Sequence, residues 1–252
     1  MEKRRTAIIG IKQTIRLEWM EKTANLLLAG LPAEKVRQEL TRYLANRRGS
    51  GLELPRSEHD CKLAVAILMN CWVNPLPEFP EIEDLRKLGL LLLREELEDH
   101  IAIHFGILRA VYPYWFNIAL QTGRLFNLQD AVAASQIVTR LKEIYGDRQT
   151  IMRTSRYVLR SFIAWDLICD SRRKGNYIKG DPIFINDVRN AGFLMLSAFY
   201  AMGTMQADFN ALFHSPAFFT FKIPSIAPET LHQLSENIEI VQIGANVLVM
   251  KK

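Results

Sequence analysis

Long side chains that carry several hydrogen-bond donors recur along residues 148–166. They are separated by four, three and four positions, a spacing that stacks them on one face of a helix. These side chains belong to Gln149, Arg153, Arg156 and Arg160. The opposite face is apolar and is expected to face a hydrophobic core; its residues are Ile151, Val158, Leu159, Phe162 and Ile163. Arginine and glutamine bind phosphates and base edges, so this helix is suited to contact a nucleic acid.

A β-hairpin is predicted directly after this helix. Residues 167–169 and 177–179 favour two short strands, and residues 171–176 favour the turn between them. The tip of the hairpin carries three cations, which can contact a phosphate backbone. These cations are Arg172, Arg173 and Lys174.

A shorter helix has to position the helix that carries the donors. Residues 134–145 have an amphipathic pattern, and Gly146 follows them as a helix terminator. Asp147 is predicted to cap the N-terminus of the next helix. The order of helix, glycine-bearing turn, basic helix and basic hairpin resembles that of winged helix-turn-helix DNA-binding proteins, over residues 128–180.

The resemblance implies that the second helix enters the major groove of double-stranded DNA, while the hairpin, or wing, lies along a neighbouring groove. The expected contacts are mainly to phosphates, with base reading by Gln149 and Arg153. Asp147 departs from this pattern, because its carboxylate repels phosphate unless it caps the helix or accepts a bond from a cytosine amine. An alternative is that the module contacts protein alone. The expected DNA-binding residues are Arg148, Gln149, Thr150, Arg153, Arg156, Arg160, Arg172, Arg173, Lys174 and Lys179.

Basic and acidic side chains are segregated along the chain, although the net charge is only +5. Residues 1–50 hold 11 basic and 5 acidic side chains, and residues 140–180 hold 10 and 4. Residues 51–139 hold 7 and 12. Blocks of this kind indicate a polyanion that is bound by particular surfaces.

Two basic segments outside the hairpin region are further candidates for phosphate contact. Arg47 and Arg48 precede a Gly-Ser-Gly turn, and an arm at residues 3–5 reads Lys-Arg-Arg. Flexible basic arms of this kind track DNA grooves. The alternative for both is a solvated segment with no ligand.

The composition is that of a folded protein, with 49% hydrophobic and 23% charged residues among 252. The fold class predicted is mainly α, with a central winged helix-turn-helix and a small α+β C-terminal part. The predicted divisions are a basic helical domain (1–75), a linker with an acidic helix (76–113), the winged helix-turn-helix (114–182) and the C-terminal part (183–252).

Outside the hairpin region the elements are predicted from apolar periodicity and from Pro and Gly positions. Helices are expected over residues 14–28, 33–44, 57–72, 82–104, 114–126 and 188–213, and after Pro228. Strands are expected over residues 218–223, 238–243 and 247–250. Three prolines between residues 74 and 80 predict a loop there.

Catalytic signatures do not stand out in the sequence. It contains no GxSxG, no GxxxxGK[ST] and no GxGxxG, so we expect no enzyme and no cofactor. Glu96, His100 and His104 recur at spacings of four and could present metal ligands on one helix face. No further ligand cluster completes such a site, so a structural role is the stronger interpretation.

Cysteine usage and hydropathy bear on the compartment. The three cysteines form no CxxC pair, which fits a reducing cytoplasm. The longest uncharged stretch, residues 190–207, is diluted by polar side chains and is expected to be a buried helix instead of a membrane span. No small-residue cleavage site follows the basic segment and the short apolar run after it, so we do not expect a cleavable leader.

A weaker resemblance covers the whole chain. The residues that carry it are Leu28-Ala29-Gly30-Leu31, Arg47-Arg48 and the run 154–168. On these the chain is similar to the BrxA-type helical DNA-binding accessory proteins of BREX phage-defence systems. The resemblance implies a cytoplasmic component of a defence or regulatory complex, with protein partners and no chemistry of its own.

Two questions stay open from the sequence. The first is whether the protein is instead an adaptor, which docks proteins through the acidic stretch 81–99 and the apolar C-terminal elements without touching DNA. The second is whether the aromatic cluster of residues 112–116 forms part of the core or stacks on unpaired bases. An oligomer is compatible with the sequence, although no heptad seam indicates one.

Overall fold

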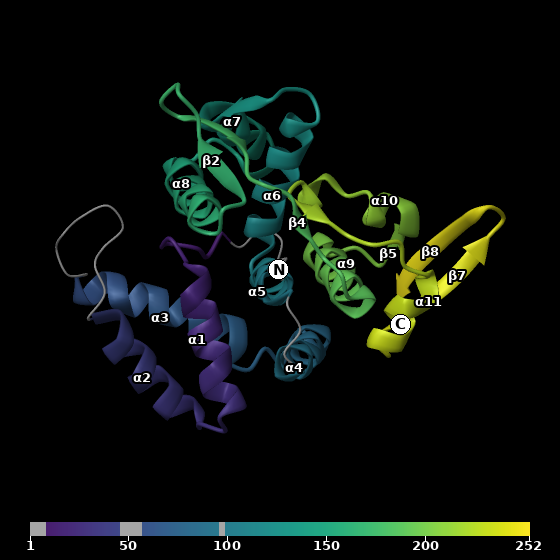
Figure 1. Ribbon diagram of the computed structural model, residues 1–252, viewed down its shortest axis with the longest axis horizontal. Coiled ribbons are helices and arrows are strands. Elements are labelled where there is room, and N and C mark those ends of the chain that lie inside the picture. The colour runs from purple at the N-terminus through teal and green to yellow at the C-terminus, as the bar shows by residue number, and fades with distance from the viewer. Residues whose placement is uncertain (1–8, 46–56, 96–98) are drawn as a thin grey trace.

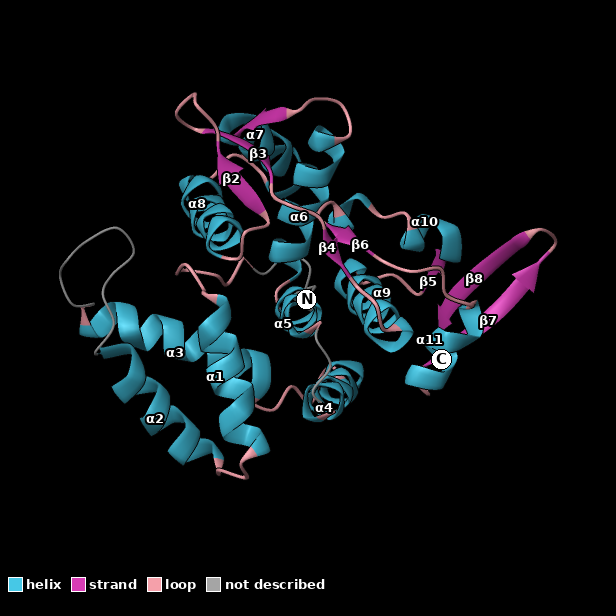
Figure 2. Cartoon of the chain, viewed as in Figure 1, coloured by secondary structure: helices cyan, strands magenta, loops and turns pink. Residues whose placement is uncertain are grey.

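The computed structural model describes residues 9–45, 57–95 and 99–252. Within these ranges the chain is mainly helical, with small sheets in its second half (Figures 1 and 2). The predicted class, mainly α with a small α+β C-terminal part, is confirmed. Arg47, Arg48 and the basic arm at residues 3–5 lie outside the described residues.

Three helices form the N-terminal part of the described chain. They are α1 (Leu17–Leu28), α2 (Ala33–Ala45) and α3 (Glu58–Trp72). A left-handed turn at Gly30, with φ of +79°, follows α1. Ser57 caps α3, because its Oγ accepts a hydrogen bond of 3.1 Å from the Asp60 backbone N–H. All three helices were predicted, but α1 begins three residues later than expected.

The central part contains three further helices. They are α4 (Pro80–Arg94), α5 (His100–Val111) and α6 (Pro113–Phe126). The single helix predicted over residues 82–104 is therefore wrong. Asp99 fixes the start of α5 from outside the helix, because its Oδ2 accepts a hydrogen bond of 2.8 Å from the backbone N–H of Asn186. This contact joins residues 87 positions apart, so it cannot be predicted from local periodicity.

The region that was predicted to resemble a winged helix-turn-helix follows α6, and we call it the winged region. It has the predicted order of elements, with one additional strand. Its elements are β1 (Ala131–Ala133), α7 (Ala134–Tyr145), α8 (Gln149–Ala164), β2 (Ile168–Asp170) and β3 (Asn176–Lys179). The three strands form an antiparallel sheet in the order β1-β3-β2, in which Val132 and Asp170 both oppose Tyr177. The first strand was missed because three residues of mixed burial give no alternating pattern.

The C-terminal part is built around one buried helix. Its elements are β4 (Ile183–Phe184), α9 (Val188–Met202), β5 (Gln206–Asp208), α10 (Phe209–Phe213), η2 (Pro216–Phe218), β6 (Phe221–Lys222), α11 (Pro228–Leu234), β7 (Ile238–Ile243) and β8 (Asn246–Lys251). The helix predicted over residues 188–213 is confirmed only over α9, because Gly203 ends that helix at φ +65°. The strand predicted over residues 218–223 is shorter than expected, and it pairs with β4. The terminal hairpin of β7 and β8 is confirmed.

Buried aromatic side chains join the central helices to the winged region. The Trp115 ring on α6 lies edge-on to the Phe162 ring on α8, with centroids 5.1 Å apart. Tyr112, Tyr114 and Phe116 are buried as well. This cluster is therefore core, and the alternative of base stacking by residues 112–116 is wrong. No helix among the described residues has the length and apolarity that a membrane span requires.

Candidate nucleic-acid interface

The N-terminus of α8 is built differently from the sequence prediction. The N-cap residue is Arg148, in extended conformation, and it provides no side-chain cap. Asp147 is therefore not the cap. Its carboxylate forms an ion pair with Lys142 on α7, with 2.8 Å between Oδ1 and Nζ. The Lys142 ammonium thus offsets the negative charge of Asp147, which departs from the pattern expected of a DNA-binding surface.

The two faces of α8 divide as the spacing predicts. Ile151, Val158, Leu159 and Phe162 are each at most 1% exposed, and Ile163 is half-buried. Gln149, Arg153, Arg156 and Arg160 are exposed on the other face.

Polar contacts hold the buried face of α8 in place. The Tyr114 and Ser155 hydroxyls lie 2.8 Å apart. The Ser161 hydroxyl accepts a hydrogen bond of 2.8 Å from the Ile15 backbone N–H. These contacts tie α8 both to α6 and to the segment before α1.

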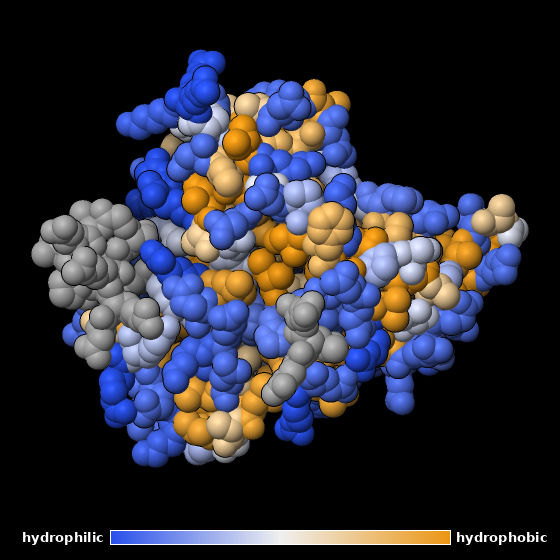
Figure 3. Space-filling model, in the orientation of Figure 1, coloured by the Kyte–Doolittle hydropathy of each residue, from blue (hydrophilic) through white to orange (hydrophobic). Residues whose placement is uncertain are grey.

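The wing (residues 168–179) presents its cations at a tight turn. The Ser171 backbone N–H donates to the Asn176 carbonyl at 2.9 Å, and Gly175 takes the positive φ, +78°, that the turn needs. Arg172, Arg173 and Lys174 are exposed at the tip. In Figure 3 the projecting tip is strongly hydrophilic.

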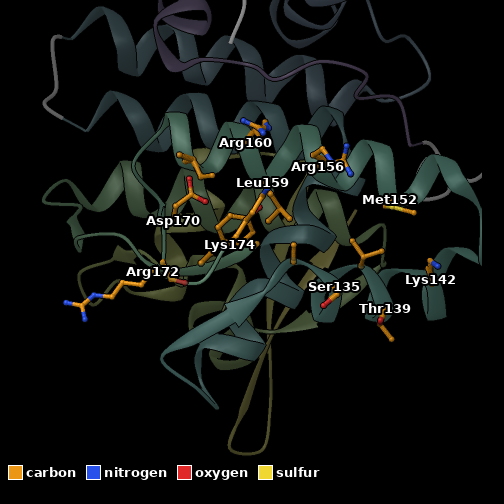
Figure 4. Close-up of a pocket in the computed structure, with 16 residues that line it drawn as sticks. Ser135, Thr139, Lys142, Met152, Arg156, Leu159, Arg160, Asp170, Arg172 and Lys174 are labelled. Carbon is orange, nitrogen blue, oxygen red and sulfur yellow. The ribbon is translucent and has the colours of Figure 1, made fainter. Parts of the chain in front are cut away.

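A groove of about 920 Å³ lies between α7, α8 and the wing, and we call it the wing groove (Figure 4). Its apolar lining comes from α7 and α8, through side chains such as Val138, Met152 and Leu159. Its cations surround this floor and are contributed by all three elements. They are Lys142, Arg156, Arg160, Arg172 and Lys174. Arg156 and Arg160 line the α8 wall, and Figure 4 shows the Arg172 side chain extending away from the groove.

Asp170 is the one acidic side chain that lines the wing groove within the described chain. It lies near Tyr177, whose pKa is raised first by burial and then by the Asp170 charge. The charges of Arg160 and Arg156 act in the opposite direction. The Tyr177 phenol is therefore neutral at physiological pH and can donate a hydrogen bond from the groove wall.

A second groove, of about 460 Å³, borders α8 where it faces the N-terminal part; we call it the N-terminal groove. Gln149, Thr150 and Arg153 line it, whereas Arg156 and Arg160 line the wing groove. The expected DNA-binding residues of α8 therefore divide between two grooves. The other residues that line the N-terminal groove are Lys12, Gln13, His59, Asp60, Leu63, Thr154 and Tyr157.

Lys179 and Arg148 are not part of either groove lining. Lys179 is exposed on β3, and its Nζ lies 5.9 Å from the centre of the Phe126 ring on α6. Arg148 is exposed and donates from Nη2 to the Tyr145 carbonyl at 2.7 Å. Lys12 and His59 were missed from the sequence. Nothing in their local pattern connects them to α8, because only the tertiary fold brings them together.

Of the two histidines considered as metal ligands, His104 lies in the core and His100 is half-buried. His104 is buried with its ring edge-on to Trp72, the centroids 5.6 Å apart. Burial, with a further contribution from His100, lowers the pKa of His104 to about 3. Glu96 lies outside the described residues. Within the part of the chain that the structure describes, no three His, Cys, Asp or Glu side chains are grouped to hold a metal ion.

No protein-family model, curated protein or solved structure matches this chain. Function is therefore inferred from the side chains of α8, the wing and the elements around them.

Proposed function

We propose that this protein binds double-stranded DNA and catalyses no reaction on it. In this proposal α8 enters the major groove and the wing contacts the phosphate backbone, as in winged helix-turn-helix proteins. The observation that carries the proposal is the exposed face of α8. None of Arg153, Arg156 and Arg160 forms a salt bridge with any described residue. Their guanidinium donors are thus available for phosphates and base edges.

The position of each donor along α8 supports a division of roles. Gln149 and Arg153 lie in the first two turns, the part of a recognition helix that contacts base edges. Arginine pairs with guanine and glutamine with adenine through two hydrogen bonds each. Arg156 and Arg160 lie further along, in the wing groove, and are assigned to phosphates together with Arg172 and Lys174. Asp170 limits how closely a phosphate approaches the floor of that groove.

The acidic residues of α4 differ from the arginines of α8, because each of them forms an ion pair with a cation of this chain. Glu81 pairs with Lys251, Glu83 with Arg86, Asp84 with Lys87, and Glu95 at the end of α4 with Arg189. A basic partner that docks on this helix would have to displace these intramolecular cations. The contrast between paired acids on α4 and unpaired arginines on α8 favours DNA over such a protein partner.

The biological setting of the proposal follows from the weaker resemblance to BrxA-type proteins. In that setting the chain is a cytoplasmic accessory component of a phage-defence complex, and a transcriptional regulator is the alternative. Both settings require the same DNA-binding surface. They differ in partners and in sequence preference.

The test is a fluorescence anisotropy titration of the protein against a random DNA duplex at two salt concentrations. Log affinity should fall linearly with log salt, with a slope of about −0.9 per phosphate neutralised. The double variant Arg156→Ala/Arg160→Ala should bind more weakly, and its slope should correspond to about two fewer neutralised phosphates.

A matched control removes the same charge elsewhere. Arg37 on α2 and Arg94 on α4 are exposed, and no described residue pairs with either guanidinium. The variant Arg37→Ala/Arg94→Ala should retain wild-type affinity and slope. Equal losses in both double variants would mean that only net charge matters, and the assignment to α8 would fail. Absence of binding by the wild-type protein at low salt would refute the proposal as a whole.

A further inference from the structure

The N-terminal groove joins three segments that are far apart in the sequence. Lys12 comes from the segment before α1, His59 from the first turn of α3, and Thr150 and Arg153 from the start of α8. In Figure 1 the segment before α1 passes beside α8. This groove and the wing groove both border α8, and they are lined by different residues of the helix.

The walls of the N-terminal groove are held together by buried contacts. Trp165 Nε1 donates to the Ile15 carbonyl at 2.9 Å, which ties the segment that bears Lys12 to the end of α8. Gln13 Nε2 donates to Asp60 Oδ1 at 2.6 Å, which ties the same segment to α3. Lys12 therefore has a fixed position relative to α8 and is not part of a loose arm.

The charges in this groove suit an anion. Lys12 and Arg153 are exposed, and neither forms a salt bridge with a described residue. Asp60 is the acid that faces them. Each of its carboxylate oxygens accepts a hydrogen bond, Oδ1 from Gln13 and Oδ2 from the Ser57 hydroxyl at 2.8 Å. Lys12 and Arg153 together carry more positive charge than the single Asp60 carboxylate offsets.

A helix that lies in the major groove has a phosphate backbone on each side. An α-helix with side chains is about 10–12 Å across and the major groove is about 12 Å wide, so the helix fills it and the two strands pass along its flanks. We infer that the N-terminal groove holds the phosphate backbone of one DNA strand on its Lys12 and His59 side, while Arg153 on its α8 side reaches the bases, and that the wing groove and wing hold the backbone of the other strand. This inference rests on the proposed function. It makes Lys12 and His59 part of the DNA-binding surface.

The first experiment repeats the salt titration on the duplex with Lys12→Gln. Loss of one phosphate contact should weaken binding at each salt concentration and reduce the steepness of the slope by about 1. His59→Gln tests a second position on the same wall and should weaken binding as well. The matched control is Lys35→Gln, because Lys35 is exposed on α2, outside both grooves.

The second experiment locates the contact without any substitution. Lysines of the full-length protein are acylated with and without saturating duplex, and each site is quantified by mass spectrometry. DNA should protect both Lys12 and Lys174 and leave Lys35 fully reactive. This readout separates a contact at Lys12 from an effect of its replacement on the fold.

The outcomes distinguish the two proposals. Protection of Lys174 alone, with wild-type binding by Lys12→Gln, would overturn the second-strand site and leave the proposed function standing. Protection of neither lysine, with no binding by the wild-type protein, would refute both.

Discussion

Trp165 donates its indole N–H to the Ile15 carbonyl oxygen across 150 residues of sequence, at 2.9 Å. Both residues are buried, and Ile15 also donates its own N–H to the Ser161 hydroxyl at 2.8 Å. The backbone of Ile15 is thus satisfied entirely by side chains from the end of α8. The N-terminal segment and the proposed recognition helix are therefore expected to unfold together.

Replacement of Trp165 tests this coupling. Trp165→Phe keeps an aromatic ring but leaves the buried Ile15 carbonyl without its donor, which should cost about 1–3 kcal/mol of unfolding free energy. Urea denaturation followed by circular dichroism measures the change. An unchanged midpoint would mean that water replaces the indole, and the coupling between the two segments would be weak.

The two faces of α8 should respond oppositely to truncation. Leu159 is 1% exposed, so Leu159→Ala should lower the free energy of unfolding by about 2–5 kcal/mol. Arg156→Ala, on the exposed face, should change it by no more than about 0.5 kcal/mol while weakening DNA binding. Chemical denaturation and anisotropy on the same two proteins give both quantities. Wild-type affinity in Arg156→Ala would exclude this side chain from the interface.

Asp170 should weaken DNA binding, since its carboxylate lines the wing groove between the cations. Asp170→Asn keeps the shape of the side chain and removes the charge, so affinity for a random duplex should rise, most clearly at low salt. The matched control is Asp181→Asn, because Asp181 is exposed and lies in neither groove lining. Lower affinity in Asp170→Asn would indicate that the carboxylate organises the wing instead of repelling DNA.

The pH dependence of stability should carry the signature of His104. Its pKa is about 3 in the folded chain and 6.5 ordinarily, so between these values the unfolded chain binds a proton that the folded chain does not. The free energy of unfolding should be insensitive to this group above pH 6.5. It should fall as the pH drops from 6.5 toward 3, by up to about 1.4 kcal/mol per pH unit.

His104→Phe should flatten that dependence relative to the wild-type protein. Urea denaturation at pH 7.5, 6.5 and 5.5 measures it. If His104→Phe and the wild-type protein show the same slope between pH 6.5 and 5.5, the buried imidazole is not the group responsible.

Local patterns predicted the parts of the fold that local physics determines. The division of α8 into an apolar and a cationic face followed from spacing, and the end of α7 followed from Gly146. The break between α4 and α5 did not follow, because Asp99 is fixed by a backbone amide 87 residues away. The helix predicted over residues 188–213 failed first at Gly203, a local terminator that ends α9. Beyond Gly203 the reason is non-local. The strand at residues 206–208 forms only by pairing with β8.

The candidate site was also predicted only in part, because local patterns identify some of its residues and tertiary contacts bring in the others. Arg156, Arg172 and Lys174 were selected by position on a helix or a turn, and the structure places them around one groove. Lys12 was not selected, because the segment before α1 has no periodic pattern. Its relation to α8 depends on Trp165 and Ser161, whose donor and acceptor roles are invisible in a one-dimensional sequence.

The place of β3 in the middle of its sheet has a consequence for how the wing can vary. β3 pairs with β1 on one edge and with β2 on the other, so its register is fixed from both sides, whatever the turn contains. The tip at residues 171–174 can therefore change without loss of the strands that support it, provided that Gly175 keeps the positive φ of the turn. Such a loop can diversify under selection while the helices beneath it stay unchanged, so the proposed contact with the phosphate backbone can be strengthened or weakened without altering α8.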